Sequence, residues 1–343
     1  MKYKIATTAF VLMSSASTLW AETYHTGLVD FKIADAAGAR PLDGYVWYPT
    51  LENGAQVPAH GNKVWENVMV TRGAALVPGP HPLVVLSHGM FGNANNQAWL
   101  AQALVEQGYI VAAVNHPGTT TFDKDPDQRR MLWQRPHDMS RVIDYVLGGA
   151  DIGAVIEPGR IFMAGHAMGG FIAVALAGGR YDASQFDGFC ATHPGELVCG
   201  IFEGWGVAKT PADRAAMQAD LADPRIAGLA VFDLGGTQSF SSPSLAAITR
   251  PMLVIGAPDT IHGLDLDIES RALVAALPKG TTTYLEPPTL AHFDFLGVCT
   301  AAGLEILKDE EPDDAFVCEK GRDERMQEHA AIADAVTAFF GGL

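Results

Sequence analysis

Three runs of consecutive apolar residues constrain the fold of this 343-residue chain more than any other feature. They span residues 83–86 (LVVL), 110–114 (IVAAV) and 161–164 (IFMA). A continuous apolar run is typical of a strand that is buried on both faces. Residues 99–107 and 139–146, which lie between these runs, repeat apolar side chains at helical spacing and are each followed by glycine. Strands alternating with helices predict a doubly wound, mostly parallel sheet of the α/β class.

The same alternation returns in the second half of the chain. Strands are expected at 229–232, 252–255 and 282–285, a final helix at 327–340, and two short antiparallel strands precede the core at 27–33 and 44–48. Residues 179–225 show no strong period and contain two cysteines with several Gly and Pro, which predicts an excursion at the edge of the sheet.

The composition indicates a globular chain with a large core, since 48% of its residues are hydrophobic and 18% are charged. We expect residues 22–343 to form one catalytic domain. The formal net charge of −16 argues against nucleic acid or an anionic membrane as a partner, because either polyanion would be repelled.

The first 21 residues have the pattern of a cleavable signal peptide. Lys2 and Lys4 precede an apolar run over 5–13, and small residues lead to Ala21. This run is too short to span a bilayer, and no other stretch is long and apolar enough to do so. The pattern predicts a periplasmic or secreted protein.

The four cysteines are interpreted as two disulfides, because their number is even and the expected compartment is oxidising. Three connectivities are possible, and the pairs Cys190 with Cys199 and Cys299 with Cys318 close the shortest loops. A zinc site is not predicted, since the sequence has neither a CxxC pair nor an HExxH string.

The string GHAMGG, residues 165–170, carries the sharpest chemical signal. It follows an expected strand and opens an expected helix, which is the context of a GxSxG nucleophile elbow. Gly165 and Gly169 supply the small residues that such a tight turn requires. Ala167 stands where the nucleophilic serine is expected, so the motif is present without its hydroxyl.

A second segment matches the other half of such a site. Ser87, His88, Gly89 and Met90 follow the first buried strand, where these folds place a backbone N–H of the oxyanion hole. The main-chain amides of Met90 and Met168 are the two predicted donors.

The stretch LVVLSHGMFGNANNQAWLAQALVEQGYIVAAVNHPG resembles platelet-activating-factor acetylhydrolases and the related bacterial predicted dienelactone hydrolases. With PMLVIGAPDT and AHFDFLG, the chain is also similar to bacterial cutinase-like polyester hydrolases. The resemblance covers roughly residue 43 to the end. It implies an α/β-hydrolase fold, ester cleavage through an acyl-enzyme and no cofactor. We expect a small-molecule or polymeric ester as substrate and no metal. Ala167 is the departure from the family pattern.

The order nucleophile, acid, histidine is filled by Ala167, an aspartate and His292, which follows the expected strand 282–285. Asp233 and Asp259 each follow a strand on the correct side of the sheet. We favour Asp259, because GAPDTIHG resembles the acid loop of dienelactone hydrolases and cutinase-like enzymes, and keep Asp233 as the alternative that acetylhydrolases use. His88, His116 and His166 are interpreted as structural or loop residues, and His262 as a weaker candidate for the base.

Two interpretations of Ala167 remain. In the favoured one, the chain is an inactivated form of a serine esterase, because the other catalytic residue types are retained. In the alternative, it is a natural pseudohydrolase that binds an ester or lipid-like ligand. The sequence leaves the ester and the oligomeric state open.

Overall fold

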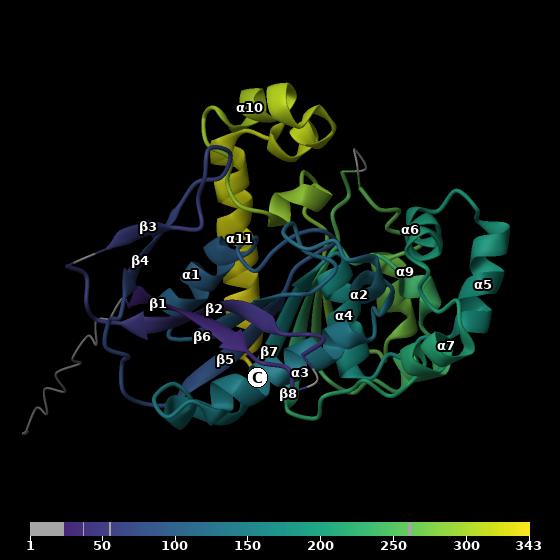
Figure 1. Ribbon diagram of the computed structural model, residues 1–343, viewed down its shortest axis with the longest axis horizontal. Coiled ribbons are helices and arrows are strands. Elements are labelled where there is room, and N and C mark those ends of the chain that lie inside the picture. The colour runs from purple at the N-terminus through teal and green to yellow at the C-terminus, as the bar shows by residue number, and fades with distance from the viewer. Residues whose placement is uncertain (1–23, 37, 55, 260–262) are drawn as a thin grey trace, which may run out of the picture.

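A ten-stranded sheet in the order β10-β9-β8-β7-β5-β6-β2-β1-β4-β3 organises the computed structural model. The structure describes residues 24–36, 38–54, 56–259 and 263–343. The expected signal peptide, residues 1–21, and His262 lie outside these ranges. The sheet has helices on both sides (Figure 1), which agrees with the doubly wound architecture predicted from the alternating pattern.

The parallel part of the sheet forms from the continuous apolar runs. Its strands are β5 (His81–Ser87), β6 (Ile110–Asn115), β7 (Ile156–His166), β8 (Ile226–Phe232), β9 (Met252–Ile255) and β10 (Thr282–Leu285). Leu83, Val84 and Val85 are inaccessible to water, as a strand covered on both faces requires. The carboxyl ends of these strands therefore meet along one edge, where loops can bring polar residues together.

The antiparallel strands extend the sheet beyond β6. β1 (His25–Ile33) and β2 (Leu42–Thr50) form a hairpin, and β2 pairs with β6. β3 (Val57–Ala59) and β4 (Val68–Arg72) complete the edge, in a segment for which no strand was predicted.

Two hydrophobic cores lie on the two faces of the sheet. Helices α3 (Gln134–Gly148) and α4 (Met168–Ala177) pack into one core, and α1 (Ala98–Glu106) and α11 (Arg322–Gly341) pack into the other. All four were predicted as helices, with α3 and α11 longer than expected. α4 is buried along its whole length, which holds the turn before it rigidly against the sheet.

The excursion between α4 and β8 is helical. It contains α5 (Ala183–Thr192), α6 (Leu197–Trp205) and α7 (Pro211–Met217), and Cys190 is bonded to Cys199. A second disulfide joins Cys299 to Cys318 around α10 (Gly303–Glu310) and the short helix Pro312–Cys318, at the top of Figure 1. Both pairings were expected. We call residues 299–318 the C-terminal flap.

The remaining elements are short. They are the helices α2 (Pro126–Arg130), α8 (Ser242–Ala246) and α9 (Ser270–Ala276), and the single 3₁₀ turns Gly153–Val155, Thr237–Ser239 and His292–Phe295. The last of these turns carries His292 to the carboxyl edge of the sheet.

Candidate active site

Ala167 occupies a strained turn between the end of β7 and the start of α4. Its backbone has φ 52° and ψ −115°, a conformation that residues other than glycine rarely adopt. Its N–H donates to the carbonyl of Phe232 at 2.9 Å, and its own carbonyl accepts from Gly170 at 2.9 Å. These bonds and the buried helix hold the turn in place, so the side chain at position 167 projects away from both elements.

The two flanking glycines are required by close contacts with backbone. A Cβ added at Gly165 would lie 2.1 Å from the carbonyl oxygen of Gly169. One added at Gly169 would lie 1.9 Å from the carbonyl oxygen of Ser87. Backbone atoms cannot yield as a flexible side chain can, so no larger residue fits at either position. The turn has the geometry that the motif predicts.

The side chain of His292 is hydrogen-bonded to that of Asp233. Its Nδ1 lies 2.6 Å from Oδ2 of the aspartate, and both side chains are buried. A carboxylate acceptor at Nδ1 fixes the tautomer with the proton on Nδ1, which leaves Nε2 with the lone pair of a base. The expectation that Asp259 pairs with this histidine is corrected by the contact with Asp233.

The loop after β8 explains why Asp233 takes this place. The φ of Asp233, 42°, turns the chain back at the end of the strand, and the N–H of Asp233 donates to the carbonyl of Ile255 at 2.8 Å. Oδ1 accepts the N–H of Ala257 at 3.0 Å, which leaves Oδ2 directed at His292. Asp259 meets the histidine loop through its backbone instead, because its N–H donates to Leu290 at 3.1 Å.

Several buried groups hold the turn His292–Phe295, and the sequence did not indicate them. Asp294 accepts the N–H of Ala291 at 2.7 Å and pairs with Arg325 on α11 at 3.0 Å. Nε2 of His166 lies 2.7 Å from the carbonyl of His292. The string HFDF places Asp294 near the histidine, but its cationic partners are Arg325 on α11 and Lys320 just before that helix, so no local pattern could have identified these pairs.

The histidines that were interpreted as structural are buried and hydrogen-bonded. His166 is 2% exposed, and burial holds its pKa well below the ordinary value, so the ring beside His292 is neutral. His88 and His116 are also buried, and burial depresses the pKa of each. His88 begins the loop that follows β5, and the ring of His116, which follows β6, lies beside it.

The two predicted oxyanion donors come from elements that meet at position 167. Met168 is the first residue of α4, so its N–H lies at the start of the helix, where backbone donors have no intrahelical acceptor. Met90 lies in the loop after β5. A Cβ at its neighbour Gly89 would come within 3.2 Å of Cβ of Ala167, which places this loop against the turn.

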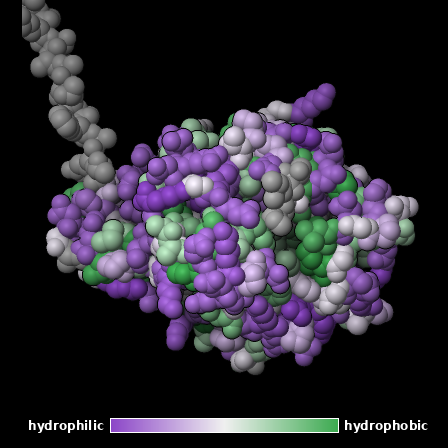
Figure 2. Space-filling view, turned by 90° about the horizontal axis from the view of Figure 1, so that it is seen from above, coloured by the Kyte–Doolittle hydropathy of each residue, from purple (hydrophilic) through white to green (hydrophobic). Residues whose placement is uncertain are grey.

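Ala167, Met90, Met168 and His292 all line one cleft with a volume of about 960 Å³. Two groups of apolar side chains line the cleft besides these residues. We call the side lined by Phe171, Leu197, Val198, Ile201, Phe202 and Leu264 the α6 wall, and the side lined by Trp65, Val298, Leu307, Phe316 and Val317 the flap wall. Figure 2 looks onto this side of the molecule and shows hydrophobic side chains around a hollow in a mostly hydrophilic surface.

Comparison with known proteins agrees with this architecture. The ferulic acid esterase from Streptomyces cinnamoneus superposes with a TM-score of 0.61 at 21% sequence identity, over 96% of this chain and 91% of the esterase. The chain has the α/β-hydrolase fold. A family model described as serine aminopeptidase, S33, matches residues 78–195 of this chain, about a third of its length, and that span includes Met90 and Ala167.

Sequence similarity to a characterised relative is local. Bis(hydroxyethyl) terephthalate hydrolase from Streptomyces coelicolor is 30% identical over 87 residues, which is 25% of this chain. The match also spans only 25% of that relative's own length.

Among the described residues of this chain, no three His, Cys, Asp or Glu side chains are grouped so that they could hold a metal ion. No helix within residues 24–36, 38–54, 56–259 and 263–343 has the length and apolar character to cross a bilayer.

Proposed function

We propose that this α/β hydrolase is a serine-type carboxylic ester hydrolase in which alanine replaces the nucleophile, with residues 22–343 as one catalytic domain. The observation that carries the proposal is the contact between His292 Nδ1 and the buried Asp233, in a cleft that also holds Ala167 at a strained strand-to-helix turn. Asp233, and not Asp259, is the proposed acid.

The geometry supports one sequence of steps for a serine at position 167. His292 Nε2 takes the hydroxyl proton while the oxygen attacks the ester carbonyl, and Asp233 stabilises the imidazolium. The N–H groups of Met90 and Met168 stabilise the oxyanion. The intermediate then collapses, and the departing alcohol takes the proton from His292. Water, activated by the same histidine, releases the acid from the acyl-enzyme. The methyl group of Ala167 performs none of these steps.

The cleft favours esters with bulky apolar or aromatic groups. Its lining includes Phe91, Trp65, Phe171, Phe293 and Phe316, and aromatic side chains offer large apolar contact areas. The names of the two relatives, a terephthalate ester hydrolase and a ferulic acid esterase, are consistent with aromatic substrates. The substrate would be a small or polymeric ester of this kind. The two disulfides favour a periplasmic or secreted location.

Restoring the nucleophile tests this proposal. Ala167→Ser is expected to raise the hydrolysis of p-nitrophenyl esters of graded acyl size by about 10⁶-fold over the present chain, by analogy with nucleophile removal in a serine protease. Circular dichroism of both forms controls for folding. A serine form that is folded but inert contradicts the proposal and favours the pseudohydrolase alternative, in which the alanine chain binds an ester or lipid-like ligand and restoring serine alters only the affinity.

A further inference from the structure

We propose that His88 is a positioning residue that orients the Gly89–Met90 peptide, so that the Met90 N–H points at the oxyanion. This inference rests on the proposed function, because it concerns the donor assigned to Met90. His88 itself does not touch the reacting atoms.

The hydrogen bonds of His88 define its tautomer. The backbone N–H of His116 donates to Nε2 of His88 at 3.2 Å, so Nε2 carries a lone pair and no proton. The neutral ring must then carry its proton on Nδ1, which lies 2.7 Å from the carbonyl oxygen of Gly89. The side chain is 2% exposed, and burial, with the nearby charge of Arg135, keeps its pKa well below the ordinary value. His88 is therefore a fixed, neutral donor to Gly89.

The acceptor of this bond belongs to the peptide that carries the oxyanion donor. The carbonyl of Gly89 and the N–H of Met90 are opposite ends of one planar unit. Holding the oxygen therefore sets the direction of the N–H. Hydrogen bonds in a chain also polarise one another, so a donor on the carbonyl makes the N–H at the other end a stronger donor.

The Gly89–Met90 peptide lies beside Ala167, where the orientation of its N–H would affect an oxyanion. Gly89 approaches Ala167 so closely that its added Cβ would come within 3.2 Å of the alanine methyl group. Gly89 and Met90 both line the cleft. Met90 is 41% exposed, so its own side chain is not packed tightly enough to fix the loop.

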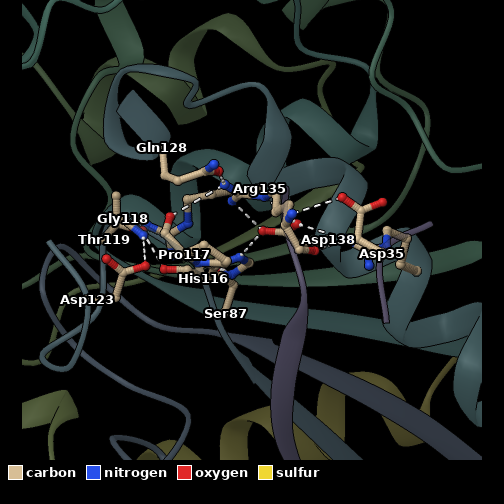
Figure 3. Close-up of polar contacts among 12 residues, drawn as sticks. Asp35, Ser87, His116, Pro117, Gly118, Thr119, Asp123, Gln128, Arg135 and Asp138 are labelled. Carbon is tan, nitrogen blue, oxygen red and sulfur yellow. Dashed lines mark hydrogen bonds and ion pairs between the residues drawn. The ribbon is translucent and has the colours of Figure 1, made fainter. Parts of the chain in front are cut away.

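A buried polar network fixes the base of the same loop. Arg135 donates to the carbonyl of His88 and, at 3.2 Å, to the hydroxyl of Ser87. The Ser87 hydroxyl lies 3.0 Å from Nε2 of His116, whose Nδ1 lies 2.9 Å from Asp138. Figure 3 shows Ser87, His116, Asp138 and Arg135 gathered together, with side chains from β5, the end of β6 and α3.

The network contains Ser, His and Asp, the residue types of a catalytic triad. Its position indicates that it holds the loop after β5 and does not act on substrate. Ser87, His116 and Asp138 are each inaccessible to water, and none of them lines the cleft. Asp138 is also held by Arg40, at 2.8 and 2.6 Å. The same His116 supplies the N–H that fixes the tautomer of His88. The network thus ties the orientation of the Gly89–Met90 peptide to α3.

The test compares variants of His88 in the Ala167→Ser background. His88→Leu removes the donor and is expected to lower kcat by about 10²-fold, the usual cost of losing an oxyanion interaction, with KM changed less than about threefold. Inhibition by phenylboronic acid, which forms a tetrahedral adduct, should weaken in parallel with kcat. His88→Asn, whose amide nitrogen occupies a position like Nδ1, should retain most of the activity and inhibitor affinity.

Matched controls separate positioning from loss of folding. His81→Leu removes a buried histidine that also contacts two backbone carbonyls, those of Gly108 and Val77, but lies at the other end of β5. It should leave kcat unchanged at a temperature where the variant is folded. If His88→Leu does not fold, His88→Asn is compared with His88→Gln, whose amide reaches the position of Nε2 and should lose kcat.

The outcomes distinguish this inference from the proposed function. If Ala167→Ser is inert, the proposed function fails. If Ala167→Ser is active but the folded His88→Leu keeps its kcat and its boronic acid affinity, the inference about His88 is overturned. Equal activities of His88→Asn and His88→Gln would overturn it as well.

Discussion

The carboxylate of Asp233 is buried. A buried carboxylate is tolerated in a folded protein when hydrogen-bond donors surround it. Asp233 has the N–H of Ala257 on one oxygen and the imidazole of His292 on the other. The imidazolium formed during catalysis would lie directly against this oxygen, where the local dielectric is low. The pair is therefore suited to stabilising a transient positive charge.

Replacement of the two candidate acids tests this arrangement. In the Ala167→Ser background, Asp233→Asn should lower kcat by roughly 10⁴-fold, because the amide favours the wrong tautomer of His292. Asp259→Asn should leave kcat nearly unchanged, since Asp259 meets the histidine loop through its backbone N–H. Steady-state kinetics on one p-nitrophenyl ester measures both. The opposite pattern would reinstate Asp259 as the acid.

Glu269 gives a prediction on stability. It is buried, and its carboxylate accepts the N–H of Thr237 at 2.7 Å, in the loop that follows Asp233. Burial raises its pKa from 4.5 to about 7. Between these values the folded state keeps a proton that the unfolded state has lost, so the free energy of unfolding should fall as pH rises from about 4.5 to about 7.

The variant Glu269→Gln should remove this pH dependence of the free energy of unfolding. Each unit of pKa shift corresponds to about 1.4 kcal/mol, so the total change is a few kcal/mol. Urea unfolding at several pH values measures it. Glu319→Gln, at an exposed position, is the control. An identical slope in the present chain and in Glu269→Gln would show that another group causes the dependence.

The residues at the site differ in how far the sequence alone could identify them. The turn at Ala167 was predictable, because a strand, a glycine-flanked turn and a helix form a local pattern, and the position of His292 was predictable because it follows an expected strand. The choice between Asp233 and Asp259 was not, since both follow adjacent parallel strands. It depends on the positive φ at Asp233 and on the amide of Ala257, which is 24 residues further along the chain. Neither has a local sequence signal.

At the scale of elements, the junction between β7 and α4 depends on close packing against β5. Gly169→Ala should destabilise the fold by about 3 kcal/mol or prevent folding, because the methyl group would meet the carbonyl oxygen of Ser87. Gly188→Ala within α5 is the matched control, since nothing lies within 4 Å of its added Cβ, and it should stabilise the helix by about 0.5–1 kcal/mol. Chemical denaturation compares the two. Equal stabilities would contradict the role of this contact.

Elements were predictable where burial imposes a simple pattern. The runs that became β5, β6 and β7 are apolar because both faces of each strand are covered. The helices α5, α6 and α7 were missed. α6 does carry apolar residues at helical spacing, at 197, 198, 201, 202 and 205, but its glycines at 200 and 204 lower the helical propensity of the segment.

At the scale of the whole molecule, each disulfide lies beside a different wall of the cleft. Replacing Cys299 and Cys318 together with alanine should lower the free energy of unfolding by about 3 kcal/mol. In the Ala167→Ser background it should also raise KM for bulky aromatic esters more than for p-nitrophenyl acetate, because the loosened flap wall no longer packs against the larger group.

The double alanine variant of Cys190 and Cys199 provides the comparison. It should lose a similar amount of stability, because the entropic cost depends only logarithmically on loop length and the separations are 9 and 19 residues. Thermal unfolding and kinetics on both variants check this. Unchanged KM values for all esters in both variants would show that the walls hold their shape without the bonds.

The separation of the disulfides from the sheet also bears on the order in which the protein matures. The hydrogen bonds and close contacts described above for Asp233, Ala167 and the loop after β5 involve no cysteine. The α6 wall and the flap wall, in contrast, each lie beside a disulfide. We therefore expect the catalytic centre to be assembled by folding and the substrate site to be completed by oxidation, so that a chain retained under reducing conditions would hold a preformed centre in an unfinished cleft.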